Sequence, residues 1–208
     1  MNDIVDISLP IFEGMPVYPG TAETAIKAVK SGSGSSVLSE ITMTSHAGTH
    51  IDAPSHSVAG GHPIDGFELS VFYGPCRVLD MTASVGAITR ADLAPANIQK
   101  GERVLLKTSN SARGFTEFYP DYVYLASDAA AYLAGVGVAL VGIDALSVKQ
   151  RGAPDNSPQT LLLEHNIAIV EGLDLSKAAA GDYMLSALPL KFTGIDGSPT
   201  RAVLLPAR

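Results

Sequence analysis

Cysteine is almost absent from this 208-residue chain, tryptophan is missing, and only 17% of the residues are charged. The lone Cys76 excludes an intrachain disulfide, and a zinc site built from several cysteines is excluded as well. Cys76 also lies within a predicted strand, which disfavours it as a catalytic nucleophile. The sequence Gly-x-Ser-x-Gly does not occur, and its absence disfavours a serine hydrolase.

Long apolar runs and basic clusters are missing too. The longest apolar run, from Ala129 to Ile143, contains three glycines and is too short to span a membrane. The net charge of −7, without a run of basic residues, disfavours nucleic acid and anionic membranes as partners. The N-terminal residues include Asp3 and Asp6 and do not resemble a signal peptide, so we expect a cytoplasmic protein.

The remaining composition is that of a well-packed globular protein. With 46% hydrophobic residues, the chain can bury a full core, and we expect one domain over residues 1–208. Its mean hydropathy of +0.22 is high for a soluble protein. We therefore expect subunit contacts in a homodimer or homotetramer.

Most segments are short, β-branched and bounded by glycine or proline, which predicts many strands and few helices. Strands are predicted at Ile4–Leu9, Thr24–Val29, Ser39–Ser45, Cys76–Asp80, Arg103–Lys107, Tyr122–Leu125, Ala139–Ile143, Ala168–Glu171 and Arg201–Leu205. Helices are predicted at Asp128–Ala134 (capped by Ser127 and ended by Gly135), from Ser157 through Pro158 to His165, and at Thr89–Leu93. Strand–helix–strand units at 122–143 and 139–171 indicate an α/β fold with parallel pairing, whereas the N-terminal third is predicted to be antiparallel.

The flexible stretch from Ser31 to Ser36 precedes the strand at 39–45. Its glycine and serine content suits a mobile flap over a site, and it suits a plain hairpin connection equally well.

The chemistry of the chain is concentrated between residues 46 and 62, which contain four of its five histidines. His46, His50 and Asp52 follow each other within seven positions, and imidazole and carboxylate are ligands for zinc, manganese or ferrous iron. In a straight strand His46 and Asp52 would lie about 20 Å apart, too far to share a metal. We therefore expect a bend at Gly48, where a missing Cβ permits unusual backbone angles.

Two more histidines follow this group. His56, four residues after Asp52, is either a further ligand or an acid–base group, because its ordinary pKa of about 6.5 suits proton transfer near neutral pH. His62 lies in a Gly-Gly-His-Pro turn and is predicted to be a loop residue.

A separate carboxylate closes the apolar strand at 168–171. Glu171 is costly to bury without a partner, so we expect a metal or an arginine beside it. Arg113 is either a surface residue or a partner for an anionic group on a substrate, and His165 is expected to be structural at a helix C-terminus.

The segment from His46 to His56, His-Ala-Gly-Thr-His-Ile-Asp-Ala-Pro-Ser-His, resembles the signature of the cyclase-like metal hydrolases, a family that includes bacterial kynurenine formamidases and isatin hydrolases. Further stretches resemble the same family over nearly the full length. They are 6–10, 14–20, 167–173, 188–191 and Asp196-Gly-Ser-Pro-Thr-Arg201. The resemblance implies a single mixed-sheet β/β/α swivelling-type domain within the α/β class.

The resemblance also implies roles for individual residues. It implies that His46, His50 and Asp52 bind a divalent metal, that Glu171 adds a carboxylate, and that His56 is the acid–base group. Zinc or manganese is the expected metal.

Two positions depart from the family pattern. Gln159, predicted in the first turn of a helix, stands where the binuclear formamidases have a histidine, and its amide is a weaker zinc ligand. We therefore expect one metal per chain, with Gln159 as a candidate ligand. Tyr18 stands where formamidases place an aromatic residue, commonly tryptophan, against the substrate.

Taken with these residues, the resemblance implies a metal-dependent hydrolase that opens a C–N amide bond in a small molecule, either an aryl formamide such as N-formylkynurenine or a small lactam such as isatin. One alternative is a metal-dependent cyclase or dehydratase acting on a carbonyl substrate. Another is a non-catalytic protein stabilised by its metal, which is disfavoured because structural zinc sites mostly use four cysteine or histidine ligands.

Overall fold

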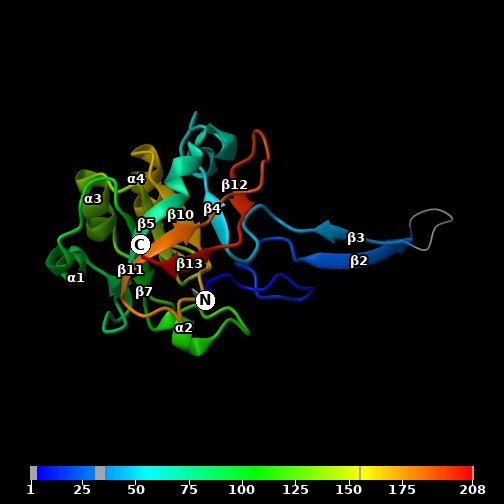
Figure 1. Cartoon of the computed structure of the whole chain (residues 1–208), viewed down its shortest axis with the longest axis horizontal. Helices are drawn as coiled ribbons and strands as arrows, with labels where there is room; N and C mark the ends of the chain where they lie inside the picture. The colour runs from blue at the N-terminus through cyan, green and yellow to red at the C-terminus, as the bar shows by residue number, and fades with distance from the viewer. Residues whose placement is uncertain (1–3, 31–35, 155, 208) are drawn as a thin grey trace.

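Four parallel strands form the centre of a nine-stranded sheet in the computed structural model, which describes residues 4–30, 36–154 and 156–207 (Figure 1). The order across the sheet is β1 (Val5–Asp6), β13 (Val203–Pro206), β11 (Gly181–Ser186), β5 (Tyr73–Asp80), β7 (Arg103–Lys107), β9 (Leu140–Ile143), β10 (Ala168–Glu171), β4 (His50–Asp52) and β12 (Gly197–Pro199). Strands β5, β7, β9 and β10 are parallel to their neighbours within this group, and all other pairs in this nine-stranded sheet are antiparallel. The predicted α/β class with a mixed sheet is confirmed.

The strand period of two divides the buried side chains between two cores. In β7, Val104 and Leu106 face one core, and Leu105 between them faces the other. The first core lies under the helices, and the second is closed by the N-terminal segment, because Ile7 hydrogen-bonds to both Ala202 and Asp174 through its backbone.

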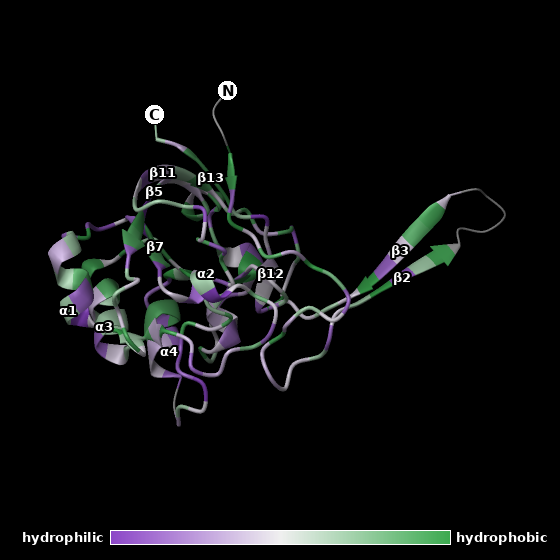
Figure 2. Ribbon diagram, turned by 90° about the horizontal axis from the view of Figure 1, so that it is seen from below, coloured by the Kyte–Doolittle hydropathy of each residue, from purple (hydrophilic) through white to green (hydrophobic). Residues whose placement is uncertain are grey.

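The helices are short and few. They are α1 (Arg90–Leu93), α2 (Asn110–Arg113), α3 (Ser127–Val136) and α4 (Ser157–Glu164), with single 3-10 turns at Pro54–His56, Ile64–Gly66, Leu69–Val71 and Ala94–Ala96. Helices α1, α3 and α4 lie side by side at one end of the molecule (Figures 1 and 2). A capping box between Thr89 and Asp92 starts α1, and the helix lies within the predicted Thr89–Leu93 segment.

Three predicted helix boundaries are wrong by one or two residues. Ser127 and Ser157 are the first residues of α3 and α4, so the N-cap positions belong to Ala126 and Asn156. Helix α3 also continues past Gly135 and ends at Gly137, which takes the left-handed conformation (φ +76°).

One predicted pairing is also wrong. The strand at 122–125 is reduced to β8 (Tyr124–Leu125) and pairs in parallel with β6 (Ala87–Ile88), outside the main sheet, so it is not a neighbour of β9. The unit from β9 through α4 to β10 is parallel as predicted. Short strands carry too little sequence pattern to specify their partners.

A two-stranded arm leaves the body of the molecule. Strands β2 (Ala25–Lys30) and β3 (Val37–Thr42) pair only with each other in the described structure and project far from the sheet (Figures 1 and 2). This pairing confirms the prediction that the strands of the N-terminal third are antiparallel. The stretch between them, predicted as a flap or a hairpin connection, lies outside the described residues except for Ser36.

Within the described residues, no helix combines the length and the apolar character that crossing a membrane requires.

Candidate metal centre

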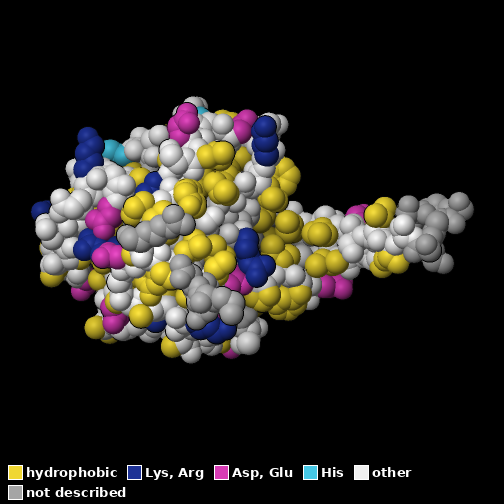
Figure 3. All heavy atoms as spheres, viewed as in Figure 1, with side chains coloured by type: hydrophobic (Ala, Val, Ile, Leu, Met, Phe, Trp, Pro, Cys, Tyr) yellow, Lys and Arg dark blue, Asp and Glu magenta, His cyan; other side chains and the backbone are white. Residues whose placement is uncertain are grey.

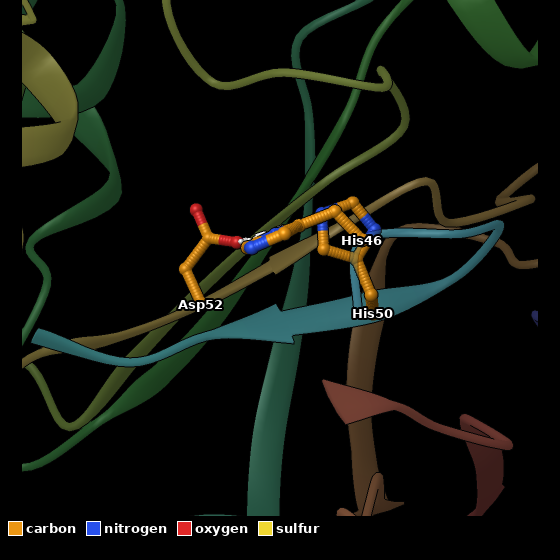
Figure 4. Close-up of side chains that lie close together, drawn as sticks. All are labelled: His46, His50 and Asp52. Carbon is orange, nitrogen blue, oxygen red and sulfur yellow. Dashed lines mark hydrogen bonds and ion pairs between the residues drawn. The ribbon is translucent and has the colours of Figure 1, made fainter. Parts of the chain in front are cut away.

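Strand β4 places His50 and Asp52 on one face of the sheet. Both side chains rise from the same side of the strand (Figure 4), while Ile51 points into the opposite core. Strand β10 runs antiparallel beside β4, and its register sets Glu171 directly opposite His50. Directly opposed residues share a face, so Glu171 joins the same group.

The turn before β4 brings His46 back to this group. Gly48 has φ +63°, the left-handed conformation that the predicted bend requires. Thr49 fixes the turn, because its hydroxyl donates to the carbonyl of Gly172 and accepts a hydrogen bond from the backbone N–H of Leu9 at 2.8 Å. As a result His46 Nδ1 lies 2.9 Å from Asp52 Oδ1, and the expected bend is confirmed.

Glycine at position 172 permits the close approach of this turn. Gly172 has φ +68°, and a Cβ there would lie 2.4 Å from the carbonyl oxygen of Gly48. The carbonyl of Gly48 in turn accepts a hydrogen bond from His50 Nδ1 at 2.9 Å. This contact leaves His50 Nε2 facing the two carboxylates, 3.5 Å from Asp52 Oδ1 and 3.3 Å from Glu171 Oε2.

The carboxylates of this group are buried, with 0% of Asp52 and 3% of Glu171 exposed. Burial alone raises the pKa of Asp52, but the hydrogen bond from His46 and the charges of the histidines outweigh it and lower the pKa to about 2. Burial and the charge of Asp52 raise the pKa of Glu171 above its ordinary value. Two carboxylates this close in the interior repel each other, so the group favours a cation between them.

The donor set has the composition of a divalent metal site. Nitrogen and oxygen ligand atoms of His46, His50 and Asp52 all lie within 4.8 Å of one another. His50 has the arrangement typical of a metal ligand, with one ring nitrogen donating to a backbone carbonyl and the other directed at the site. Imidazole and carboxylate together suit zinc or manganese.

A third carboxylate, that of Asp196 on the rim of the site, contacts two histidines. Asp196 Oδ2 lies 2.9 Å from His46 Nε2 and 3.2 Å from His56 Nδ1, while Ser45 donates to Oδ1 at 2.8 Å. Burial alone lowers the pKa of His46, but hydrogen bonds and charges from Asp52 and Asp196 outweigh it and raise the pKa to about 9. Burial raises the pKa of Asp196, but bonds from His46, Ser45 and His56 outweigh it and leave the pKa well below its usual range.

The sequence prediction did not include Asp196 among the site residues. The available signal was its place in the Asp196–Arg201 stretch, which resembles a family motif.

Gln159 and Tyr18 also lie at this site. Gln159 is buried in the first turn of α4, and its Nε2 donates to Asp52 Oδ2 at 2.6 Å. Tyr18 lines a cavity of about 420 Å³ together with His46, His50 and His56. The Tyr18 ring packs edge-on against Phe118, with ring centroids 5.5 Å apart.

Three other candidate residues lie outside the site. His62 bonds to Asn166 at 2.6 Å, and His165 bonds to the carbonyl of Leu161 within its own helix. Arg113 pairs with Asp121 at 2.8 Å and does not line the cavity.

Comparison with known proteins agrees with this geometry. Residues 5–150 match the model of the Cyclase family, described as "Putative cyclase". A kynurenine formamidase of Bacillus cytotoxicus is 35% identical over 208 residues, which cover 99% of this chain and 98% of that protein. One from Bacillus cereus is 36% identical, with the same coverage. This chain therefore belongs to the cyclase family.

Solved structures with a similar fold cover nearly the whole chain as well. A structure described as a predicted metal-dependent hydrolase from Bacillus stearothermophilus has a TM-score of 0.89 and 36% identity, with 100% of both chains covered. An isatin hydrolase from Labrenzia aggregata has a TM-score of 0.82 with 23% identity, covering 99% of this chain and 94% of that one. At that identity the isatin hydrolase shows the shared fold alone.

Proposed function

We propose that this protein is a metal-dependent hydrolase of C–N amide bonds, with an aryl formamide as its substrate class. The observation that carries the proposal is the position of His50 Nε2 between the buried carboxylates of Asp52 and Glu171, with His50 and Glu171 lining a 420 Å³ cavity. The kynurenine formamidases at 35–36% identity over nearly the whole chain support the reaction class.

His46, His50, Asp52 and Glu171 would hold the metal, because their donor atoms gather where two buried carboxylates need a cation. Zinc or manganese fits, and we propose one per chain. A bound metal of this kind polarises the substrate carbonyl and lowers the pKa of water toward about 7. Gln159 stays a predicted ligand, and its hydrogen bond to Asp52 gives it the further role of holding that carboxylate in place.

His56 is the proposed acid–base residue. Its side chain is 30% exposed at the rim of the cavity, and its Nδ1 faces Asp196, so Nε2 remains to exchange protons. It would take a proton from the attacking water and return one to the leaving nitrogen. Tyr18 provides an aromatic surface in the cavity that suits an aryl group, and Phe118 packs edge-on against the Tyr18 ring.

Two rival functions make different predictions. A cyclase or dehydratase would use the same metal without opening an amide bond, so assays of aryl formamide and lactam opening separate the reactions. A purely structural metal is disfavoured by the cavity, which opens the donor set to small molecules, whereas structural zinc sites are closed.

The deciding experiment begins with elemental analysis of the purified chain. The chain with its metal restored is then assayed on N-formylkynurenine and on isatin. We expect about one metal per chain and turnover of the formamide. A metal-loaded protein that opens neither substrate would refute the proposal.

We also propose that the protein is a cytoplasmic homodimer or homotetramer. The arm supports self-association, because its β3 strand exposes Val37, Leu38 and Ile41 by 74%, 53% and 55%. Hydrophobic side chains also gather on the face of the body next to the arm (Figure 3). Exposed apolar patches of this kind typically mark protein interfaces. Light scattering on the eluting protein tests this, and a monomer would contradict it.

A further inference from the structure

We infer that Asp196 is a positioning residue that holds His46 and His56 together in the ring orientation and tautomer that the reaction needs. The inference rests on the proposed function for the roles of the two histidines. It adds a residue that lies 150 positions from His46 in the chain and acts on both rings through one oxygen, Oδ2.

The contact with His46 fixes which ring nitrogen keeps its proton. His46 Nδ1 points to Asp52 and so to the proposed metal side, and Nε2 points to Asp196 Oδ2 at 2.9 Å. A nitrogen that binds a metal must offer a lone pair, so the proton of neutral His46 must sit on Nε2. The carboxylate of Asp196 is an acceptor for that proton, an arrangement that orients metal-binding histidines in many proteins.

The contact with His56 works in the same way. Its Nδ1 lies 3.2 Å from Asp196 Oδ2, and a carboxylate can only accept, so Nδ1 carries the proton. The lone pair is then on Nε2, free to take a proton from water. The two rings lie with centroids 4.1 Å apart, so one carboxylate can serve both without moving.

The surroundings of Asp196 hold the carboxylate still. Ser45 donates to the other carboxylate oxygen of Asp196 at 2.8 Å. The backbone carbonyl of Asp196 accepts a hydrogen bond from the N–H of Ala53 at 2.9 Å. The next residue, Gly197, pairs with Asp52 in strand β12, and a Cβ at 197 would lie 2.9 Å from His46 Cε1. The small residue at 197 thus lets the His46 ring lie against the strand that follows Asp196.

Asp196 itself could instead be a ligand, since His46, His56 and Asp196 also form a cluster of suitable donors. A positioning residue and a ligand give different results on substitution. Removal of a ligand abolishes metal binding at its site, whereas loss of a positioning carboxylate weakens metal binding by about 10–100-fold and leaves the stoichiometry unchanged.

The test uses Asp196→Asn in the full-length protein, with Asp182→Asn as the matched control because Asp182 is exposed on β11, away from the site. Titration with zinc and with manganese gives the dissociation constant and the number of metals. We expect an unchanged number of metals, binding weaker by about 10–100-fold in Asp196→Asn, and no change in the control. This readout does not need activity, so it stays valid if the proposed amide hydrolysis fails.

Kinetics at saturating metal test the link to His56. We expect a lower kcat with little change in KM for Asp196→Asn, and no additional loss when Asp196→Asn is combined with His56→Ala, because the positioned ring is already gone. Asp196→Glu, which keeps the carboxylate, should recover part of the kcat. If Asp196→Asn fails to fold, Ser45→Ala removes only the bond to Oδ1 and should show smaller losses in the same direction.

Three outcomes overturn the inference. The first is a metal affinity within about twofold of the unmodified protein in Asp196→Asn. The second is an equal loss of kcat with and without His56, which would mean that Asp196 acts independently of that ring. The third is the loss of a whole equivalent of metal, which would make Asp196 a ligand.

Discussion

Gln159 donates a hydrogen bond to Asp52 at 2.6 Å, across 107 positions of the chain, and both side chains are buried. The amide nitrogen of Gln159 donates to Oδ2 of the carboxylate, while Oδ1 faces His46 and His50. Gln159 therefore holds the Asp52 carboxylate through Oδ2, and Oδ1 remains directed at the two histidines. This relationship links helix α4 to strand β4 and makes Gln159 the residue expected to control how many metals bind.

Gln159→His should raise the occupancy of a second metal position. Imidazole is a better zinc ligand than an amide, and Glu171 lies close enough to His50 to share in a second site. The unmodified protein should hold one metal per chain in elemental analysis, and the variant should hold more. Two metals in the unmodified protein would contradict the single-metal proposal.

One metal in both forms of the protein would mean that Gln159 does not coordinate metal. Gln159→Leu then tests whether Gln159 supports the Asp52 carboxylate through its hydrogen bond instead. If Gln159 only orients the carboxylate, the leucine variant should still bind one metal, with weaker affinity.

Asp52→Ala should abolish metal binding and activity. The substitution removes the buried carboxylate that both histidines contact, and with it the negative charge of the site. Metal content after dialysis and hydrolysis of the formamide are the measurements, with Asp182→Ala as the control for losing an aspartate from an exposed strand position. Retention of stoichiometric metal would refute the assignment of Asp52.

His56→Ala should lose activity by about 10²–10⁴-fold while keeping its metal, because the loss of a general acid–base group has that magnitude. His165→Ala is the matched control, since that histidine is exposed at the C-terminal end of α4, where its ring bonds to the carbonyl of Leu161. If His56→Ala also loses the metal, His56 belongs among the ligands.

Gly172→Ala should destabilise the protein and weaken metal binding together. An alanine there must adopt φ +68° and place its Cβ 2.4 Å from the carbonyl oxygen of Gly48, which accepts the hydrogen bond of His50. Left-handed backbone strain alone costs about 1–3 kcal/mol. Gly152→Ala has the same strain (φ +73°) in open space, so it measures strain without the clash.

Denaturant unfolding with and without metal gives both quantities for these two glycine variants. We expect the larger loss of stability, and the only loss of metal affinity, in Gly172→Ala. Equal results in the two variants would mean that the Gly48–Gly172 contact does not shape the site.

Removal of the metal by a chelator should abolish activity and leave the chain folded. The two hydrophobic cores lie on either side of the sheet and do not depend on the metal ligands for their packing. Circular dichroism and activity before and after chelation, followed by metal addition, provide the measurement. Unfolding on chelation would instead identify the metal as a structural element.

Much of the site was predictable because its residues are close in the sequence. The spacing of His46, His50 and Asp52 around Gly48 favoured a bent strand to bring the three together, and the bend is present. The apolar strand at 168–171 is also found at the predicted residues, with Glu171 at its end. Local pattern and elementary geometry were sufficient for these features.

The tertiary structure alone decided the contacts between distant segments. Asp196 reaches His46 only because β12 pairs with β4, and Gln159 reaches Asp52 only because α4 packs beside β10. Strands of two or three residues, such as β8 and β12, contain too few side chains to encode a partner in their sequence pattern. The sequence thus predicted the cluster of His46, His50 and Asp52 from local spacing. The packing of distant segments determined how Asp196 and Gln159 join this cluster, because those contacts form only when segments more than 100 positions apart pack together.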